Sequence, residues 1–100
     1  MDDGISQADL HKAVEAGARI RRVVVVELAD GRYAAFLRFA GRPGFMRVAL
    51  RRYEGVKLWR DLHPLRAALS QCRFRGCVWL CPQDHPSLLQ LGISIASTGA

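Results

Sequence analysis

Four potential metal ligands stand close together near the carboxyl-terminal end of the sequence: Cys72, Cys77, Cys81 and His85. Structural zinc sites usually pair such residues across about two to four intervening positions, so these spacings are loosely compatible with zinc. If Cys77 and Cys81 share one straight strand, however, they lie about 13 Å apart on one face, too far for two ligands of one ion. We therefore expect free, core-packed thiols with no metal or other cofactor, and keep a small zinc-stabilised domain as the third interpretation.

Acid–base catalysis would need a titratable side chain held beside a partner, and the candidates are His11, His63 and His85 with Asp61 or Asp84. Their local contexts favour other roles, such as a helix cap for Asp61 and a polar turn for Asp84 and His85. The sequence contains no nucleophile elbow, phosphate-binding glycine loop or His-Glu-x-x-His helix. The expectation is a protein that is not an enzyme and has no catalytic residues.

Arginine is the remaining candidate for chemistry, because the chain carries a net charge of +6 and every arginine lies between Arg19 and Arg75. A field of this sign favours polyanions or an acidic protein surface. The residues expected to contact DNA or such a partner are Arg32, Arg38, Arg47, Arg51, Arg52, Lys57 and Arg60. If Arg38 and Arg47 share a sheet face, they and Arg51 form a surface able to neutralise phosphates.

Aromatic residues occur among these cations and could stack on bases: Tyr33, Phe36, Phe39, Tyr53 and Trp59. At strand spacing most of them are better explained as core residues. The arginines themselves have an alternative role, which is to keep exposed strands and sheet edges in water.

The first elements that must position these side chains are a helix and a strand. Ser6 can cap a helix whose apolar positions recur at three- and four-residue steps, at Leu10, Ala13, Val14 and Ala18. From Ile20 to Ala29, a run of four valines favours a strand that is buried on much of both faces.

Turn signals then divide the next part of the chain into two further strands. Asp30-Gly31 favours a tight hairpin, and the strand that returns over Arg32–Phe39 has one apolar face and one half-polar face. Gly41–Gly44 predicts a second reversal of the chain. Apolar and polar residues alternate over Phe45–Tyr53, which predicts a strand with one face exposed to water. Together these segments predict an antiparallel meander.

The carboxyl-terminal half predicts one main helix and one more strand. Val56–Trp59 is either a short strand or the approach to a helix. Beyond it, a helical stripe follows Asp61, which is a plausible cap, and its members are Leu62, Leu65, Leu69 and Cys72. Phe74–Leu80 reads as a strand and Pro86–Leu91 as a single helical turn.

The predicted fold class is α+β: an antiparallel β-meander of about three to four strands packed against one main helix, with a short N-terminal helix. Residues 1–100 form a single domain, whose tail is expected to fray from about residue 92. The chain shows no secretion signal and no apolar run of roughly 20 residues, so we expect a cytoplasmic protein without membrane contact. Exposed strand edges would permit a homodimer.

Four segments of the sequence are similar to one protein family: Glu15–Ala18, the valine run Val23–Val26, Gly31–Phe39, and Arg52 with Val56–Leu65. Between Glu15 and about Val78 the chain resembles the small plasmid-encoded ParC-type partition-associated proteins, which are distinct from the topoisomerase subunit of that name. It departs from them at Arg73 and at Trp79-Leu80. The resemblance implies a plasmid-borne accessory role and transfers no catalytic or binding residue.

The leading hypothesis is therefore a non-catalytic plasmid-maintenance accessory protein that binds DNA, or a partition or regulatory protein, through an arginine-rich sheet surface. A protein-interaction module without affinity for nucleic acid is the alternative. It would form a homodimer or bind an acidic partner.

Overall fold

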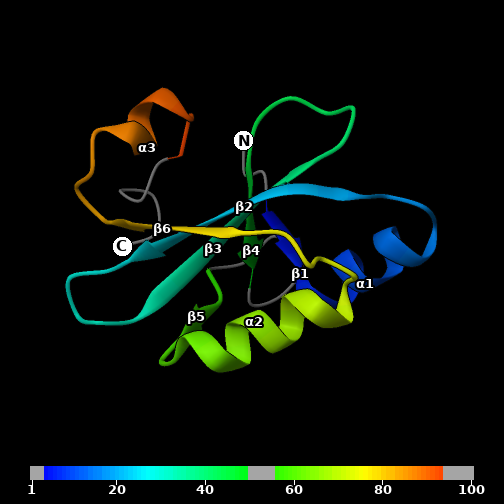
Figure 1. The fold of residues 1–100 in the computed structure, drawn as a ribbon, viewed down its shortest axis with the longest axis horizontal. Coiled ribbons are helices and arrows are strands. Elements are labelled where there is room, and N and C mark those ends of the chain that lie inside the picture. Colours follow the sequence, from blue (N-terminus) through cyan, green and yellow to red (C-terminus); the bar gives the residue numbers. More distant parts are fainter. Residues whose placement is uncertain (1–3, 50–55, 94–100) are drawn as a thin grey trace.

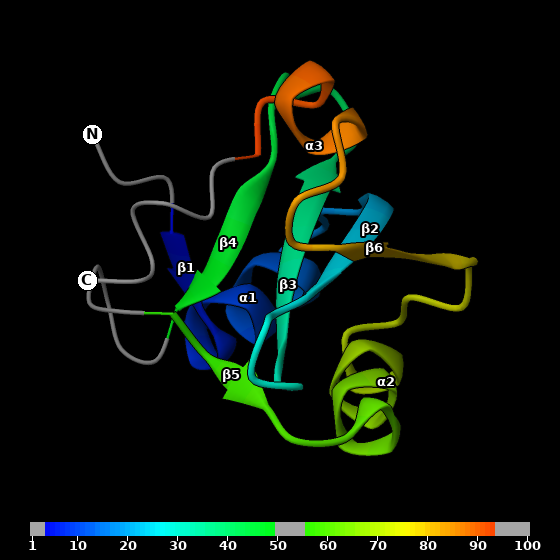
Figure 2. The ribbon, with the colours of Figure 1, turned by 90° about the vertical axis from the view of Figure 1, so that its left-hand side faces the viewer.

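The computed structural model describes residues 4–49 and 56–93, which form a mixed β-sheet with helices on both faces (Figures 1 and 2). In chain order the elements are β1 (Gly4–Ser6), α1 (Gln7–Glu15), β2 (Ile20–Glu27), β3 (Tyr33–Phe39), β4 (Met46–Ala49), β5 (Leu58–Trp59), α2 (Leu62–Gln71), β6 (Val78–Pro82) and α3 (Ser87–Gln90). None of the helices in these two segments has the length and apolar character needed to cross a bilayer.

The strand order is β1-β4-β3-β2-β6, and β5 adds a short pairing to β3. Strands β2, β3 and β4 form the predicted antiparallel meander, but β1 pairs with β4 and β6 pairs with β2 in parallel. The α+β class is confirmed, whereas the simple antiparallel meander on one main helix is wrong. A strand reached through a helical connection, as β6 is through α2, can lie parallel to its neighbour.

The predicted hairpin joins β2 to β3. The Leu28 N–H donates to the Arg32 carbonyl at 2.8 Å, and the Gly31 N–H donates to the Leu28 carbonyl at 2.9 Å. On the strand side, Val23–Val26 are fully buried because β2 lies between β3 and β6 and is covered on both faces. The prediction that the valine run is buried on both faces is confirmed, and the parallel pairing with β6 places β2 inside the sheet.

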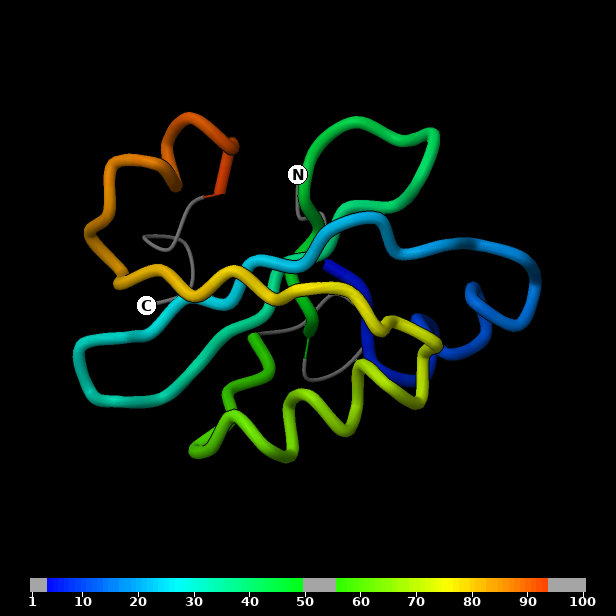
Figure 3. The backbone as a smooth tube through the Cα atoms, in the orientation of Figure 1, coloured from blue at the N-terminus to red at the C-terminus, as the bar shows by residue number. Residues whose placement is uncertain are grey.

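Two apolar cores lie on opposite faces of the sheet. The larger core joins alternate residues of β2 and β3, such as Val25 and Leu37, to Leu10 of α1 and to Leu65 and Leu69 of α2. The smaller core joins the other face of the same strands to α3 and to the segment after it. Its buried side chains are Val24, Val26, Ala34, Phe36, Val56, Leu88 and Ile93. Figure 3 shows α3 as a small coil at one end of the sheet, so this second cover is partial.

Both main helices begin near their predicted caps. The Ser6 side chain accepts a hydrogen bond from the Asp9 N–H at 3.1 Å and so caps α1. Asp61 occupies the N-cap position of α2 without a side-chain hydrogen bond to the helix. The helical stripe ending at Cys72 faces the larger core, as its spacing predicts.

The structure settles one choice that the sequence left open and changes two of the predicted boundaries. Val56–Trp59 contains the strand β5, which settles the open choice. The strand predicted over Phe74–Leu80 begins only at Val78, as β6. Phe74 is still hydrogen-bonded to the end of α2, since its N–H donates to the Leu69 carbonyl. Ile93 is buried, so the packed structure continues past residue 92, and the predicted tail beyond it lies outside the described residues, as do Leu50–Tyr53.

Candidate nucleic-acid interface

The register between β2 and β3 places Arg22 directly opposite Arg38. Paired residues on neighbouring strands project from the same face, with Cβ atoms about 5 Å apart. This is the face that α3 partly covers, because Arg22 alternates with Val23 of the larger core and Arg38 with Leu37. Neither arginine has a carboxylate within ion-pair distance among residues 4–49 and 56–93.

Strand β6 brings an aromatic side chain next to these cations. Trp79 pairs in register with Val24, and the guanidinium carbon of Arg22 lies 4.8 Å from the centroid of its indole ring. Strand β6 is the last strand in the sheet order, and Trp79 on it is 48% exposed. A cation above an exposed ring combines a phosphate ligand with a stacking surface.

A β-bulge adds a third arginine at the same end of the sheet. The ladder between β2 and β3 passes from Ile20–Phe39 to Arg22–Arg38, so Arg21 is the extra residue without a partner on β3. Bulges redirect side chains in this way. Arg21, Arg22 and Arg38 border an open pocket of ≈ 300 Å³, and we call Arg21, Arg22, Arg38 and Trp79 together the arginine face.

Of the cations predicted from sequence, Arg38 and Arg47 share this side of the sheet. Arg47 pairs in register with Phe36, two residues before Arg38, so the two arginines are diagonal neighbours. The Arg47 side chain also lies over β1, where a Cβ built on Gly4 would stand 3.2 Å from its guanidinium carbon. The meander therefore does bring together two of the residues chosen from the sequence.

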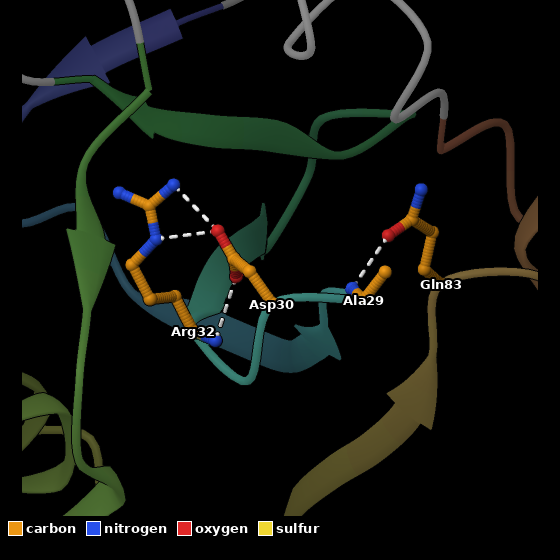
Figure 4. Close-up of polar contacts among 4 residues, drawn as sticks. All are labelled: Ala29, Asp30, Arg32 and Gln83. Carbon is orange, nitrogen blue, oxygen red and sulfur yellow. Dashed lines mark hydrogen bonds and ion pairs between the residues drawn. The ribbon is translucent and has the colours of Figure 1, made fainter.

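Arg32 lies at the opposite end of β3, in the hairpin loop (Figure 4). Its Nε and Nη2 atoms donate to Asp30 Oδ2 at 2.8 and 2.6 Å, while its backbone N–H donates to Asp30 Oδ1 at 3.0 Å. The hydrogen bond from the Arg32 side chain lowers the pKa of Asp30, and the same bond raises the pKa of Arg32. Arg32 is thus neutralised locally.

Two more of the predicted cations, Lys57 and Arg60, flank β5 and do not border the pocket at the arginine face. Lys57 precedes β5, and its ammonium nitrogen lies 5.7 Å from the centroid of the Trp59 ring. Arg60 follows β5 and is exposed. Arg51 and Arg52 lie outside the described residues.

Sequence reasoning missed Arg21, Arg22 and Trp79. For Arg22 the sequence contained a signal. Arg22 alternates in step with Val24 and Val26, so these side chains project from one face of the strand, next to the half-polar face of the following strand. For Arg21 and Trp79 there was none, because a bulge and a parallel pairing between distant segments leave no periodic pattern in one strand.

A buried thiol, an imidazole and a carboxylate stand in a row between α1 and α2. Cys72 Sγ lies 4.0 Å from His11 Nδ1, and His11 Nε2 lies 3.4 Å from Glu15 Oε1. Thiol catalysis needs the thiolate, and burial raises the pKa of Cys72, which disfavours that form. The row is therefore explained as a packing contact at the helix interface.

The four residues weighed as potential zinc ligands are distributed over different parts of the chain. Cys72 is buried at the end of α2, Cys77 is exposed before β6, and Cys81 lies beside the smaller core. His85 Nδ1 accepts a hydrogen bond from the Ser87 N–H at 3.1 Å. Within residues 4–49 and 56–93, no three His, Cys, Asp or Glu side chains converge closely enough to hold a metal ion.

No protein-family model, curated protein or solved structure matches the chain. The resemblance to partition-associated proteins therefore stays a prediction from the sequence segments quoted above. The arginine face has to be interpreted from its own chemistry.

Proposed function

We propose that this chain is a non-catalytic protein that binds nucleic acid through the arginine face. The observation that carries the proposal is the direct opposition of Arg22 and Arg38, with no carboxylate partner among the described residues. Like charges opposite each other on neighbouring strands destabilise a sheet. A polyanion laid across the pair would remove that repulsion and gain charge-assisted hydrogen bonds.

Trp79 favours an unpaired strand of DNA as the ligand. Its half-exposed indole lies beside Arg22, so one nucleotide can place its phosphate on a guanidinium and its base on the ring. Sheet surfaces that combine arginines with exposed aromatic rings suit unpaired strands, whose bases are free to stack. A duplex offers phosphates to the same arginines but no accessible base for Trp79.

The test is a titration of labelled single-stranded and duplex DNA at two salt concentrations. Arg22→Gln/Arg38→Gln should weaken binding and lower the slope of log K against log salt by about 0.7 for each phosphate that the variant no longer neutralises. Trp79→Ala should weaken single-strand binding by roughly tenfold and duplex binding much less. Arg66→Gln is the matched control, because Arg66 is an exposed arginine on α2, away from the arginine face. Equal binding by the double variant and this control would overturn the proposal.

The biological setting that goes with this activity is an accessory role in plasmid partition. It is supported by the resemblance of the sequence to ParC-type proteins. A plasmid stability assay of the Arg22→Gln/Arg38→Gln variant in the native host tests this setting separately from DNA binding.

A protein-interaction module is the second candidate, and strand β6 favours it. In the described part of the chain β6 pairs only with β2, and Trp79 and Leu80 on it are 48% and 50% exposed. An open strand edge with apolar side chains can pair with a second copy of the chain. Sedimentation of the wild type and of Leu80→Lys distinguishes this candidate, which predicts a dimer that the substitution dissociates.

A further inference from the structure

Helices α1 and α2 end on the same side of the molecule (Figure 1). Their ends, the start of β2 and the loop from α2 to β6 surround an open pocket of ≈ 510 Å³, which we call the helix-end pocket. Pockets that hold small molecules usually have volumes of about 300–1,000 Å³. The helix-end pocket falls within this range.

Four arginines border the helix-end pocket: Arg19, Arg21, Arg73 and Arg75. All four are exposed, and none has an ion-pair partner among the described residues. None of the residues that line the pocket in this part of the chain is acidic; most of the others are apolar, including Val14, Ile20 and Phe74. The Cys72 thiol also lines it, and burial raises its pKa, so it adds no negative charge.

Arg73 occupies a backbone conformation that normally belongs to glycine. It follows the C-cap of α2 with φ 63°, where its N–H donates to the Ser70 carbonyl at 2.9 Å and the Phe74 N–H donates to the Leu69 carbonyl at 3.0 Å. Helices α1 and α3 end with the same pair of bonds, but at the equivalent position they have Gly17 at φ 110° and Gly92 at φ 75°. The chain therefore uses arginine here where it uses glycine at the two other helix ends within residues 4–49 and 56–93.

Helix dipoles explain only part of this arrangement. The carboxyl ends of α1 and α2 carry partial negative charge and attract cations, but the effect fades within the last turn. Arg21 belongs to β2, and Arg19 and Arg75 lie in the connections to β2 and β6, outside either helix. A basic residue held in a left-handed conformation, together with three more around an apolar floor, is better suited to an anionic ligand.

We propose that the helix-end pocket binds the phosphate groups of a small phosphorylated molecule. Arg73 and Arg75 hold the phosphates from the α2–β6 loop, Arg19 holds them from the α1–β2 connection and Arg21 from β2, and the apolar floor receives the rest of the molecule. The planar guanidinium group suits this role, because it donates two parallel hydrogen bonds to a phosphate. This site does not depend on DNA binding, since Arg73 and Arg75 lie outside the arginine face.

Pyrophosphate is the probe for the test, titrated into ¹⁵N-labelled protein at constant ionic strength, with an oligoglutamate peptide as the second arm. Saturable shifts should appear at the amides of residues 73–76 and 17–21. Arg73→Gly should weaken pyrophosphate binding about tenfold, which is the usual effect of losing a hydrogen bond to a charged group. The same variant should melt about 4 °C higher without ligand, because glycine relieves the backbone. Arg75→Gln is the second variant, and Arg38→Gln, on the arginine face, is the control.

The outcomes separate this site from the DNA-binding surface. Loss of pyrophosphate binding in Arg73→Gly and Arg75→Gln, with binding retained in Arg38→Gln, supports the proposal. Absence of saturable shifts in the wild type, equal affinity in Arg73→Gly, or shifts with oligoglutamate alone would overturn it. Failure of DNA binding in the arginine-face variants leaves this result unaffected, because those variants keep Arg73 and Arg75.

Discussion

Arg22 and Arg38 face each other across β2 and β3, although both carry a positive charge. Strand pairing fixes them in place, since the neighbouring pairs Val23–Leu37 and Val24–Phe36 are buried. The packing of the sheet thus holds together two groups that repel each other. This arrangement favours function over stability, and it can be tested on both counts.

Arg38→Gln should raise the free energy of unfolding by about 0.2–1 kcal/mol, since it removes a like-charge pair while keeping a polar side chain. Arg22→Gln should do less, because it also removes the contact with Trp79. Urea unfolding of both single variants and the double variant forms a double-mutant cycle. A coupling energy that showed attraction between the two arginines would contradict this account.

Arg73→Gly should raise the free energy of unfolding by about 1 kcal/mol, because an L-residue in the left-handed region is strained and glycine is not. Gly17→Ala is the matched reverse substitution at the end of α1. A Cβ there meets nothing within 4 Å, so its expected loss of about 1 kcal/mol reflects the backbone alone. Both changes are measured by urea unfolding, and a destabilised Arg73→Gly would refute the assignment of strain.

The buried thiol of Cys72 should make stability depend on pH in the alkaline range. Its pKa is raised in the folded protein, so its contribution is complete below the unfolded value of about 8.5 and is lost as pH rises through the folded value. Unfolding free energies between pH 7 and 10 should therefore fall more steeply for the wild type than for Cys72→Ala. In the native state a thiol reagent should modify Cys77 well before Cys72.

The ion pair in the hairpin loop should have the opposite pH dependence. Since Arg32 lowers the pKa of Asp30, the stabilisation is present above the unfolded value of about 3.9 and is lost as pH falls through the folded value. The difference in unfolding free energy between the wild type and Asp30→Asn should therefore shrink from pH 6 to pH 3. The effect is small because both groups are exposed.

Arg32→Gln should leave the affinity for DNA unchanged at constant salt. Arg32 is already neutralised by Asp30, and it lies at the end of β3 remote from Arg38. Fluorescence anisotropy beside Arg38→Gln measures this directly. Equal losses in the two variants would mean that the binding surface extends along the whole strand.

Local chemistry made much of the fold predictable. The Ser6 cap, the Asp30-Gly31 hairpin and the stripe from Leu65 to Cys72 each depend on residues near one another in the chain, and each is present in the structure. The valine run also predicted a strand that is buried on both faces, because such burial selects apolar residues at every position.

Contacts between distant segments account for what the sequence did not predict. The three residues of β1 form a strand only because β4 is available to pair with them, and β6 joins β2 across more than half the chain. The arginines of the helix-end pocket gather for the same reason, since Arg19 and Arg73 become neighbours only when two helices end side by side. No periodicity within one segment carries this information.

Arg21 borders both the arginine face and the helix-end pocket, because the bulge leaves it unpaired at their junction. One guanidinium group cannot bind fully to ligands at both sites. A ligand that binds Arg21 at one site therefore lowers the affinity of the other site for its own ligand. Thermodynamic reciprocity requires the penalty to be equal in both directions. A ligand bound in the helix-end pocket would then weaken binding at the arginine face, because the two sites compete for Arg21.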